Sequence, residues 1–222
     1  MFHEKNQYKY RNRRKKLLEE LRSKGISSEA VLKAIESVPR HLFVDTGFAD
    51  RAYEDSALPI ALGQTISQPF TVARQTELLE VKAGEKILEI GTGSGYQAAI
   101  LAELGAQVYS VERHRELYHR GQDALREAGY RVMLKCGDGT EGWSAYAPFD
   151  GIIVTAGAPV VPEALKAQLS AGGRLVIPVG DGDKQVMYRI TRRAEETGEE
   201  AHFDEEAFSD FKFVPLIGRQ GW

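Results

Sequence analysis

Apolar residues recur at two different spacings along this chain, and the spacing changes near residue 85. Before residue 60 they follow the period of an amphipathic helix in two segments. The residues that carry this period are Leu17, Leu18, Leu21, Val31, Ile35 and Val38. Gly25 separates the segments, Ser27 or Ser28 can cap the second by accepting from free backbone N–H groups, and Pro39 stops it. The N-terminal part therefore predicts two helices.

From residue 85 onward, short apolar runs of strand length alternate with segments of helical period. The expected strands are Lys86–Ile90, Gln107–Glu112, Val132–Lys135, Gly151–Val154 and Arg174–Val179. Helices are expected from about Gln97 to Leu104, over a segment that carries Leu117 and Leu125, and from Pro162 to a point before Gly172. Such alternation is typical of an α/β fold with a doubly wound parallel sheet.

Two further strands, Gln185–Ile190 and Phe211–Leu216, are expected to complete a mostly parallel, seven-stranded sheet. Between them, residues 195–206 hold seven acidic side chains, and we predict an exposed loop there because like charges repel and stay hydrated. Residues 41–70 are rich in Pro, Gly and polar turn formers, so they predict a long irregular connection. Connections of that length are often functional.

Charge and cysteine content exclude few classes of function. The net charge of −3 gives no general reason to expect a polyanion partner, and the eight Lys or Arg within residues 1–22 are interpreted as a solvated helix face. The single cysteine, Cys136, excludes an internal disulfide framework, fits a reducing cytosol, and is expected to be an apolar filler on a buried strand. Because no segment resembles a signal peptide or a membrane span, we expect a cytoplasmic protein.

A glycine-rich turn joins the first of the strands to the helix that follows it. It reads Glu89-Ile90-Gly91-Thr92-Gly93-Ser94-Gly95-Tyr96-Gln97. Glycines allow positive φ and close approach of a ligand, and the next helix offers unpaired N–H groups, so the turn predicts a nucleotide-like ligand. A dinucleotide fingerprint wants Gly or Ala where Tyr96 stands, which weakens an NAD interpretation.

Two acidic residues end the next two strands at the same edge of the sheet. Glu112 follows Gly91 by 21 residues, where a carboxylate can accept both hydroxyls of a ribose. Asp138 follows the third strand, where it or the neighbouring backbone can bind an adenine amino group. The order of strand, glycines and acids predicts a nucleoside site. No metal is expected, because the five histidines show no paired ligand spacing.

Residues 89–95 resemble motif I of class I S-adenosylmethionine-dependent methyltransferases, and Glu112 and Asp138 stand where that family keeps its ribose and adenine acids. A more specific resemblance, to protein-L-isoaspartate O-methyltransferases, spans roughly residues 15–218. The segments that carry it are Pro39–Val44 (PRHLFV), Leu62–Pro69 (LGQTISQP), Gly137–Gly139 (GDG), Ala158–Leu165 (APVVPEAL), Gly172–Gly180 (GGRLVIPVG) and Phe213–Leu216 (FVPL). Phe70 follows Pro69 as in bacterial members, and Ile217-Gly218 lacks the Thr of animal forms.

The resemblance implies a Rossmann-like α/β/α sandwich with an N-terminal helical appendage. It also implies methyl transfer from S-adenosylmethionine to the α-carboxylate of L-isoaspartyl residues, which leaves S-adenosylhomocysteine and a methyl ester that closes to a succinimide and so starts repair. We expect a single domain over residues 1–222. Within it, 1–60 would hold the N-terminal helices and a loop, 61–84 the active-site loop and a helix, and 85–222 the cofactor-binding core and C-terminal strands.

By resemblance, Ser67 is the active-site serine, whose hydroxyl donates a hydrogen bond to orient the substrate carboxylate. It is not expected to be a nucleophile, because no G-x-S-x-G elbow surrounds it. Val214 and Pro215 match a segment near which the family holds the substrate peptide. The expected cofactor-binding residues are Gln64, Thr65, Ile66, Glu89, Gly91, Thr92, Gly93, Ser94, Gly95, Gln97, Glu112, Arg113, Asp138 and Gly139.

Three other functions are compatible with parts of the sequence. A methyltransferase acting on RNA or a small molecule would share residues 85–140 but has no reason to carry the segment around Ser67. A non-catalytic S-adenosylmethionine-binding protein would not need Ser67, and an NAD-dependent oxidoreductase is disfavoured by Tyr96. The expected partners are damaged proteins and peptides with L-isoaspartyl residues, with no stable nucleic-acid partner, no membrane, and a monomeric enzyme.

Overall fold

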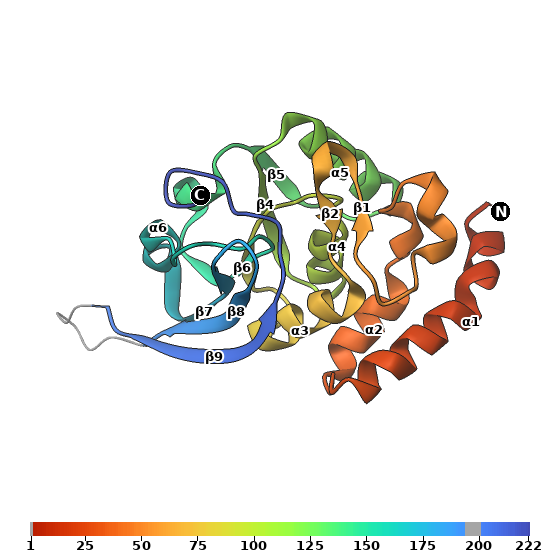
Figure 1. Cartoon of the computed structure of the whole chain (residues 1–222), viewed down its shortest axis with the longest axis horizontal. Coiled ribbons are helices and arrows are strands. Elements are labelled where there is room, and N and C mark those ends of the chain that lie inside the picture. The colour runs from red at the N-terminus through yellow and green to blue at the C-terminus, as the bar shows by residue number, and fades with distance from the viewer. Residues whose placement is uncertain (1, 194–200) are drawn as a thin grey trace.

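The computed structural model describes residues 2–193 and 201–222, and a seven-stranded sheet lies at its centre (Figure 1). The strands are β3 (Lys86–Ile90), β4 (Gln107–Glu112), β5 (Met133–Cys136), β6 (Phe149–Val154), β7 (Leu169–Gly180), β8 (Gln185–Arg192) and β9 (Phe203–Phe211). Their order across the sheet is β5-β4-β3-β6-β7-β8-β9. The first five in this order pair in parallel, and β8 and β9 add antiparallel pairs. The predicted fold class is confirmed.

Helices cover both faces of the sheet. They are α1 (Phe2–Ser23), α2 (Glu29–Ser37), α3 (Pro69–Leu79), α4 (Tyr96–Glu103), α5 (Arg115–Glu127) and α6 (Glu163–Ala167). The two predicted N-terminal helices are confirmed and lie at one end of the molecule, against α3 and α4 (Figure 1). The Ser28 hydroxyl caps α2 by accepting from the Val31 N–H at 3.4 Å.

Alternation along the central strands sends apolar side chains to two separate cores. On β3, Ile87 belongs to the core that contains buried residues of α1 to α4, whereas Leu88 and Ile90 belong to a second core with Leu165 of α6 and buried residues of β7. All three side chains are at most 1% exposed. Because both faces are buried, these strands read as continuous apolar runs, which is why their bounds were predicted within one or two residues except for β7.

The connection over residues 41–70 is irregular, as expected, but it contains a small hairpin. Strand β1 (Leu58–Pro59) pairs with β2 (Thr65–Ile66), and 3₁₀ turns over Arg40–Leu42, Thr46–Arg51 and Ala61–Gly63 make up much of the rest. Helix α3 begins directly after it, at Pro69, where the missing N–H costs nothing. The hairpin carries residues 64–67 to the carboxyl edge of the large sheet.

The last strand was predicted at the wrong place. Residues 203–206 of the predicted acidic loop belong to β9, and the expected strand Phe211–Leu216 leaves the sheet after Phe211. Acidic side chains stay hydrated on this edge strand, where Glu206 and Asp204 pair with Arg189 and Arg193. The acidic side chains of residues 203–206 therefore correctly indicated exposure to solvent, but the loop inferred from them was wrong. Residues 195–200 of the predicted loop lie outside the described residues.

One smaller expectation holds and another fails. The helix predicted from Pro162 to a point before Gly172 is α6, which has Pro162 as its N-cap and ends at Ala167 because β7 begins at Leu169. Cys136 is exposed at the end of β5, which lies at the edge of the sheet, and it is not an internal filler. Among the described residues, no helix has the length and apolar character needed to span a membrane.

Candidate functional site

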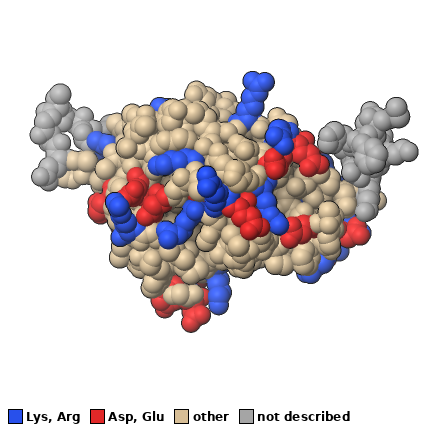
Figure 2. All heavy atoms as spheres, turned by 90° about the horizontal axis from the view of Figure 1, so that it is seen from above, with Lys and Arg blue, Asp and Glu red and all other residues tan. Residues whose placement is uncertain are grey.

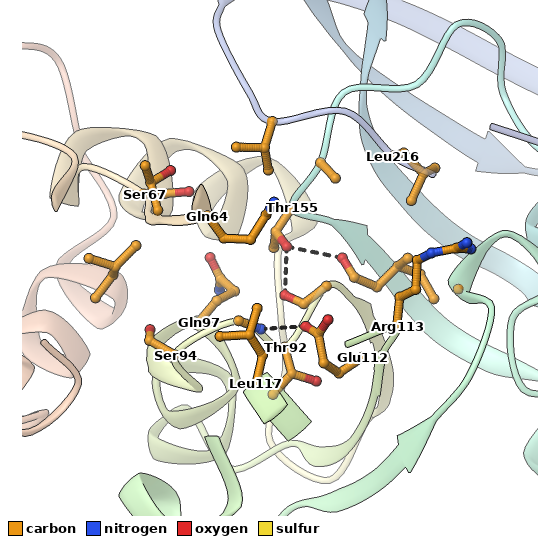
Figure 3. A pocket seen from close by; sticks show the side chains of 18 of the residues that line it. Gln64, Ser67, Thr92, Ser94, Gln97, Glu112, Arg113, Leu117, Thr155 and Leu216 are labelled. Carbon is orange, nitrogen blue, oxygen red and sulfur yellow. Dashed lines mark hydrogen bonds between the residues drawn. The ribbon is translucent and has the colours of Figure 1, made fainter. Parts of the chain in front are cut away.

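A pocket opens at the carboxyl ends of β3, β4 and β6, and three segments far apart in the sequence form its walls (Figure 3). These segments are residues 64–67, which include the second strand of the hairpin, the glycine-rich turn 91–97, and residues 214–217 near the C-terminus. The pocket encloses about 960 Å³ of space between atoms, a volume that includes open solvent. The carboxyl edge of an open α/β sheet is where small-molecule ligands bind.

Most of the residues that the sequence nominated meet in this pocket. Those that line it are Gln64, Thr65, Ile66, Ser67, Gly91, Thr92, Gly93, Ser94, Gln97, Glu112, Arg113, Gly139, Val214 and Pro215. Ser67 and Glu112 lie on opposite sides of the cavity (Figure 3). Glu89, Gly95 and Asp138 were also expected in the site, but they do not line the pocket.

The first glycine of the turn needs to be glycine for two reasons. Gly91 has a φ of +96°, and an added Cβ would lie 2.5 Å from the Thr155 hydroxyl oxygen. That hydroxyl contacts the carbonyls of Ile90 and Gly91 at 3.0 and 2.7 Å, as the dashed lines in Figure 3 show. Thr155 follows β6, so the neighbouring strand holds the turn in its bent shape.

Glu112 is connected to the same turn. Its Oε2 accepts from the Gly93 N–H and its Oε1 accepts from the His114 N–H, both at 2.8 Å. The side chain is 4% exposed and lines the pocket. Each carboxylate oxygen has two lone pairs, so each keeps an acceptor site for a ligand hydroxyl.

Glu89 lies beneath the turn and is fully buried. It accepts a short hydrogen bond from the Ser110 hydroxyl, and Ser110 in turn contacts the Thr92 hydroxyl at 2.6 Å. Burial raises the pKa of Glu89 to about 8, and the nearby charge of Glu112 acts in the same direction, against the Ser110 hydrogen bond. The Glu89 carboxyl is therefore largely protonated at neutral pH and supports the turn from below.

Gln97 supplies a polar atom to the floor of the pocket. Its Nε2 donates to the Thr76 hydroxyl at 2.9 Å, whereas its buried Oε1 has no partner among the described residues. A buried acceptor without a partner is costly, and a ligand donor would remove that cost. The residue that the sequence nominated therefore presents an acceptor for an ammonium or amide group.

The C-terminal segment closes the pocket from the side of β6. Gly157 donates to the Val214 carbonyl at 2.8 Å, and Leu216 donates to the Gly157 carbonyl at 2.7 Å. Asp138 anchors the end of this segment, because its Oδ2 accepts from the Arg219 N–H at 2.9 Å and its Oδ1 accepts from the Thr140 N–H at 2.9 Å. Asp138 is thus engaged with the chain, while the neighbouring Gly139 lines the pocket.

Several lining residues were not nominated from the sequence. They are Val72, Gln75, Ile90, Tyr96, Val111, His114, Leu117, Thr155, Ala156, Leu216 and Ile217. Thr155 could have been found as the polar residue after the fourth strand, at the same edge as Glu112 and Asp138. Nothing in the local sequence marks Gln75 or Leu117, which face the pocket from the sides of helices. Among the described residues, no group of three or more His, Cys, Asp or Glu side chains could hold a metal ion.

Comparison with known proteins identifies the family. Residues 12–221 match the family model described as Protein-L-isoaspartate(D-aspartate) O-methyltransferase. Relatives named protein-L-isoaspartate O-methyltransferase include one from Cytophaga hutchinsonii, 49% identical over 97% of this chain and 95% of its own length. Another, from Salinibacter ruber, is 53% identical over 94% of this chain and 93% of its own length.

Solved structures agree with the sequence comparison. One described as a protein-L-isoaspartate O-methyltransferase superposes with a TM-score of 0.83 at 28% identity, covering 94% of this chain and 67% of that one. A Plasmodium falciparum structure of the same description, in complex with S-adenosyl-L-homocysteine, has a TM-score of 0.76 at 25% identity and covers 91% and 97%. Because the family model and these relatives match nearly its whole length, the chain belongs to the protein-L-isoaspartate (D-aspartate) O-methyltransferase family.

Proposed function

We propose that this protein transfers a methyl group from S-adenosylmethionine to the α-carboxylate of L-isoaspartyl residues in damaged proteins and peptides. One observation carries the proposal: the Ser67 segment and the glycine-rich turn face a single pocket, although 24 residues separate Ser67 from Gly91. A pocket of this kind brings an acceptor and a nucleoside donor together. Family membership supplies the substrate class.

The residues of the pocket fit S-adenosylmethionine. Glu112 keeps acceptor sites for the two ribose hydroxyls, and the glycine-rich turn lets the backbone approach the ligand closely. The unpartnered Oε1 of Gln97 can accept from the ammonium of the methionine portion. Gly139 has room for no side chain, since an added Cβ would lie 2.4 Å from Ile90 Cγ2. When bound, the cofactor supplies an activated methyl group, which passes to a carboxylate oxygen.

Few catalytic side chains are needed for this reaction. A carboxylate with a pKa of about 4 is already ionised at neutral pH, so no general base has to remove a proton. Positioning and exclusion of water supply the rate enhancement. In our proposal Ser67 donates a hydrogen bond that orients the carboxylate, while the segment around Val214 and Pro215 holds the peptide backbone. Outside the enzyme, a backbone amide nitrogen attacks the ester carbonyl, and methanol leaves as the succinimide closes.

Recognition of one bond in many proteins calls for contacts to backbone and carboxylate rather than to a particular side chain. We propose a monomeric, cytoplasmic enzyme without a stable nucleic-acid partner. On the face shown in Figure 2, basic and acidic side chains are interspersed, which does not favour a polyanion. RNA affinity that falls steeply with salt would instead favour an RNA methyltransferase.

The test uses two synthetic peptides that differ only in one isoaspartyl or aspartyl linkage. Labelled S-adenosylmethionine should give base-labile labelling of the isoaspartyl peptide alone. Ser67→Ala should reduce this labelling, and Ser209→Ala, an exposed serine on β9, should not. Labelling of neither peptide by a wild-type protein that still binds the cofactor would refute the proposal. Full activity of Ser67→Ala would remove Ser67 from the mechanism.

A further inference from the structure

Arg40 is the largest side chain that is completely buried in the described part of the chain, and it lies outside the pocket lining. It starts the short 3₁₀ turn after α2. None of the ion pairs among the described residues includes Arg40, so no carboxylate contacts its charge directly. Burial lowers the pKa of Arg40 despite the opposing effects of Tyr96 and Asp55. A cation buried at such a cost needs an explanation in its contacts.

The contacts of Arg40 connect two walls of the pocket. Its Nη2 donates to the Ser67 carbonyl at 2.9 Å and lies 3.5 Å from the Ser56 carbonyl. The carbon of the guanidinium is 4.7 Å from the centre of the Tyr96 ring. Ser67 belongs to the segment 64–67 that forms one wall of the pocket. Tyr96 follows the last glycine of the glycine-rich turn and starts α4. Both residues line the pocket.

The Ser67 segment is held at its other end by a second buried group. Asp55, whose side chain is 2% exposed, accepts from the Phe70 N–H at 2.7 Å and pairs with Lys24 at 2.6 Å. Asp55 thus satisfies a free N–H at the start of α3, where a negative charge is favourable. With Arg40 on the Ser67 carbonyl and Asp55 on the Phe70 amide, the main chain of residues 67–70 has little freedom.

We propose that Arg40 is a positioning residue for methyl transfer, because its guanidinium holds the Ser67 main chain at a fixed distance from Tyr96 and hence from the cofactor side of the pocket. The inference rests on the proposed function of Ser67. Unlike lysine, arginine combines donors in the plane of its cationic head group with a flat face that stacks on an aromatic ring. A lysine in place of Arg40 keeps the positive charge and can still donate to the Ser67 carbonyl. A methionine fills a similar volume but has neither the charge nor a donor.

The first experiment compares Arg40→Met and Arg40→Lys in the full-length protein. For Arg40→Met we expect kcat on an isoaspartyl peptide to fall by about 10- to 100-fold, the cost of a displacement on the order of 1 Å. The Kd for S-adenosylhomocysteine should stay within about threefold, because the turn itself is intact, and Arg40→Lys should restore part of kcat. Arg126→Met, an exposed arginine on α5, is the matched control and should behave as the wild type.

The second readout does not depend on the reaction. Hydrogen exchange of a peptide covering residues 64–70 should accelerate in Arg40→Met, while a peptide covering 91–97 should keep its protection. If the wild type fails to methylate the peptide but exchange changes as expected, the proposed function fails and the positioning contact stands. Four outcomes would overturn the inference. Exchange of the 64–70 peptide could be unchanged in Arg40→Met, or its kcat could stay within twofold of wild type. Arg40→Lys and Arg40→Met could lose kcat equally, or neither variant could fold.

Discussion

The Glu112 carboxylate accepts from the Gly93 N–H at 2.8 Å, so the end of β4 and the glycine-rich turn after β3 form one unit. The two residues come from neighbouring parallel strands, which bring their carboxyl ends to the same edge. The same carboxylate thus shapes the turn and lines the pocket. A change at Glu112 should affect both.

Glu112→Gln should weaken S-adenosylhomocysteine binding by about 10- to 100-fold. The amide would turn a donor toward one of the two N–H groups that now donate to the carboxylate, and would lose charge-assisted acceptance of ribose hydroxyls. Isothermal calorimetry measures the effect. Glu116→Gln, the same change at an exposed site on α5, is the control. An affinity within threefold of wild type would contradict a ribose-binding role.

Gly91→Ala should abolish measurable cofactor binding, because its Cβ would clash with the Thr155 hydroxyl at 2.5 Å. Gly129→Ala separates this clash from backbone strain. Gly129 has a similar φ of +84° but open space around it, so the change should cost only about 1 kcal/mol. Thermal melting and cofactor-binding assays of both variants test this prediction. Equal losses of stability and affinity in the two variants would indicate that backbone strain, not the contact with Thr155, is responsible.

Glu89 should make the stability of the protein fall as the pH rises. Its pKa, about 8 in the folded state, is above the value of about 4.5 in the unfolded chain, so the native state binds the extra proton between these values. The contribution is fully present below about pH 4.5 and is lost as the pH rises through 8. Glu89→Gln removes this titration.

The comparison of Glu89→Gln with wild type isolates the effect, because other groups titrate in both proteins. We expect the Tm difference to be within about 2 °C at pH 5.5 and to grow in favour of the variant by about 4 °C or more at pH 8.5. A difference that is constant over this range would show that Glu89 does not titrate in it.

Asp138→Asn should loosen the C-terminal segment. Partial burial acts to raise the pKa of Asp138, but hydrogen bonds from Arg219 and Thr140 outweigh it and hold the pKa below its ordinary value. The Asp138 contribution to stability is therefore present above about pH 4 and lost as the pH falls further. The asparagine variant should be cleaved faster by trypsin after Arg219 and bind the cofactor about 3- to 10-fold more weakly.

The control for this change is Asp123→Asn, which removes an exposed carboxylate on α5 that pairs with the neighbouring Arg126. It should leave both the cleavage rate and the affinity unchanged. If Asp138→Asn loses affinity without faster cleavage, a direct contact with the ligand becomes the better explanation.

Local patterns were enough to predict the strands of the central sheet, the glycine-rich turn and its acids. Period and turn chemistry depend on neighbours in sequence, and parallel strands buried on both faces leave an unambiguous apolar run. The edge of the sheet was not predictable in the same way. All residues of strand β9 are exposed or half-buried, so its sequence resembles that of a charged loop, and it becomes a strand by pairing with β8.

The pocket depends on contacts that no local pattern contains. Thr155 holds the Gly91 carbonyl across 64 residues, and Asp138 holds the Arg219 amide across 81. Arg40 reads as an ordinary residue after a proline, yet folding buries it against Ser67 and Tyr96. Motifs in the sequence indicate which residues can bind a nucleoside and a carboxylate. The relative positions of these residues follow from packing, because hydrogen bonds between distant segments form only when the sheet has assembled.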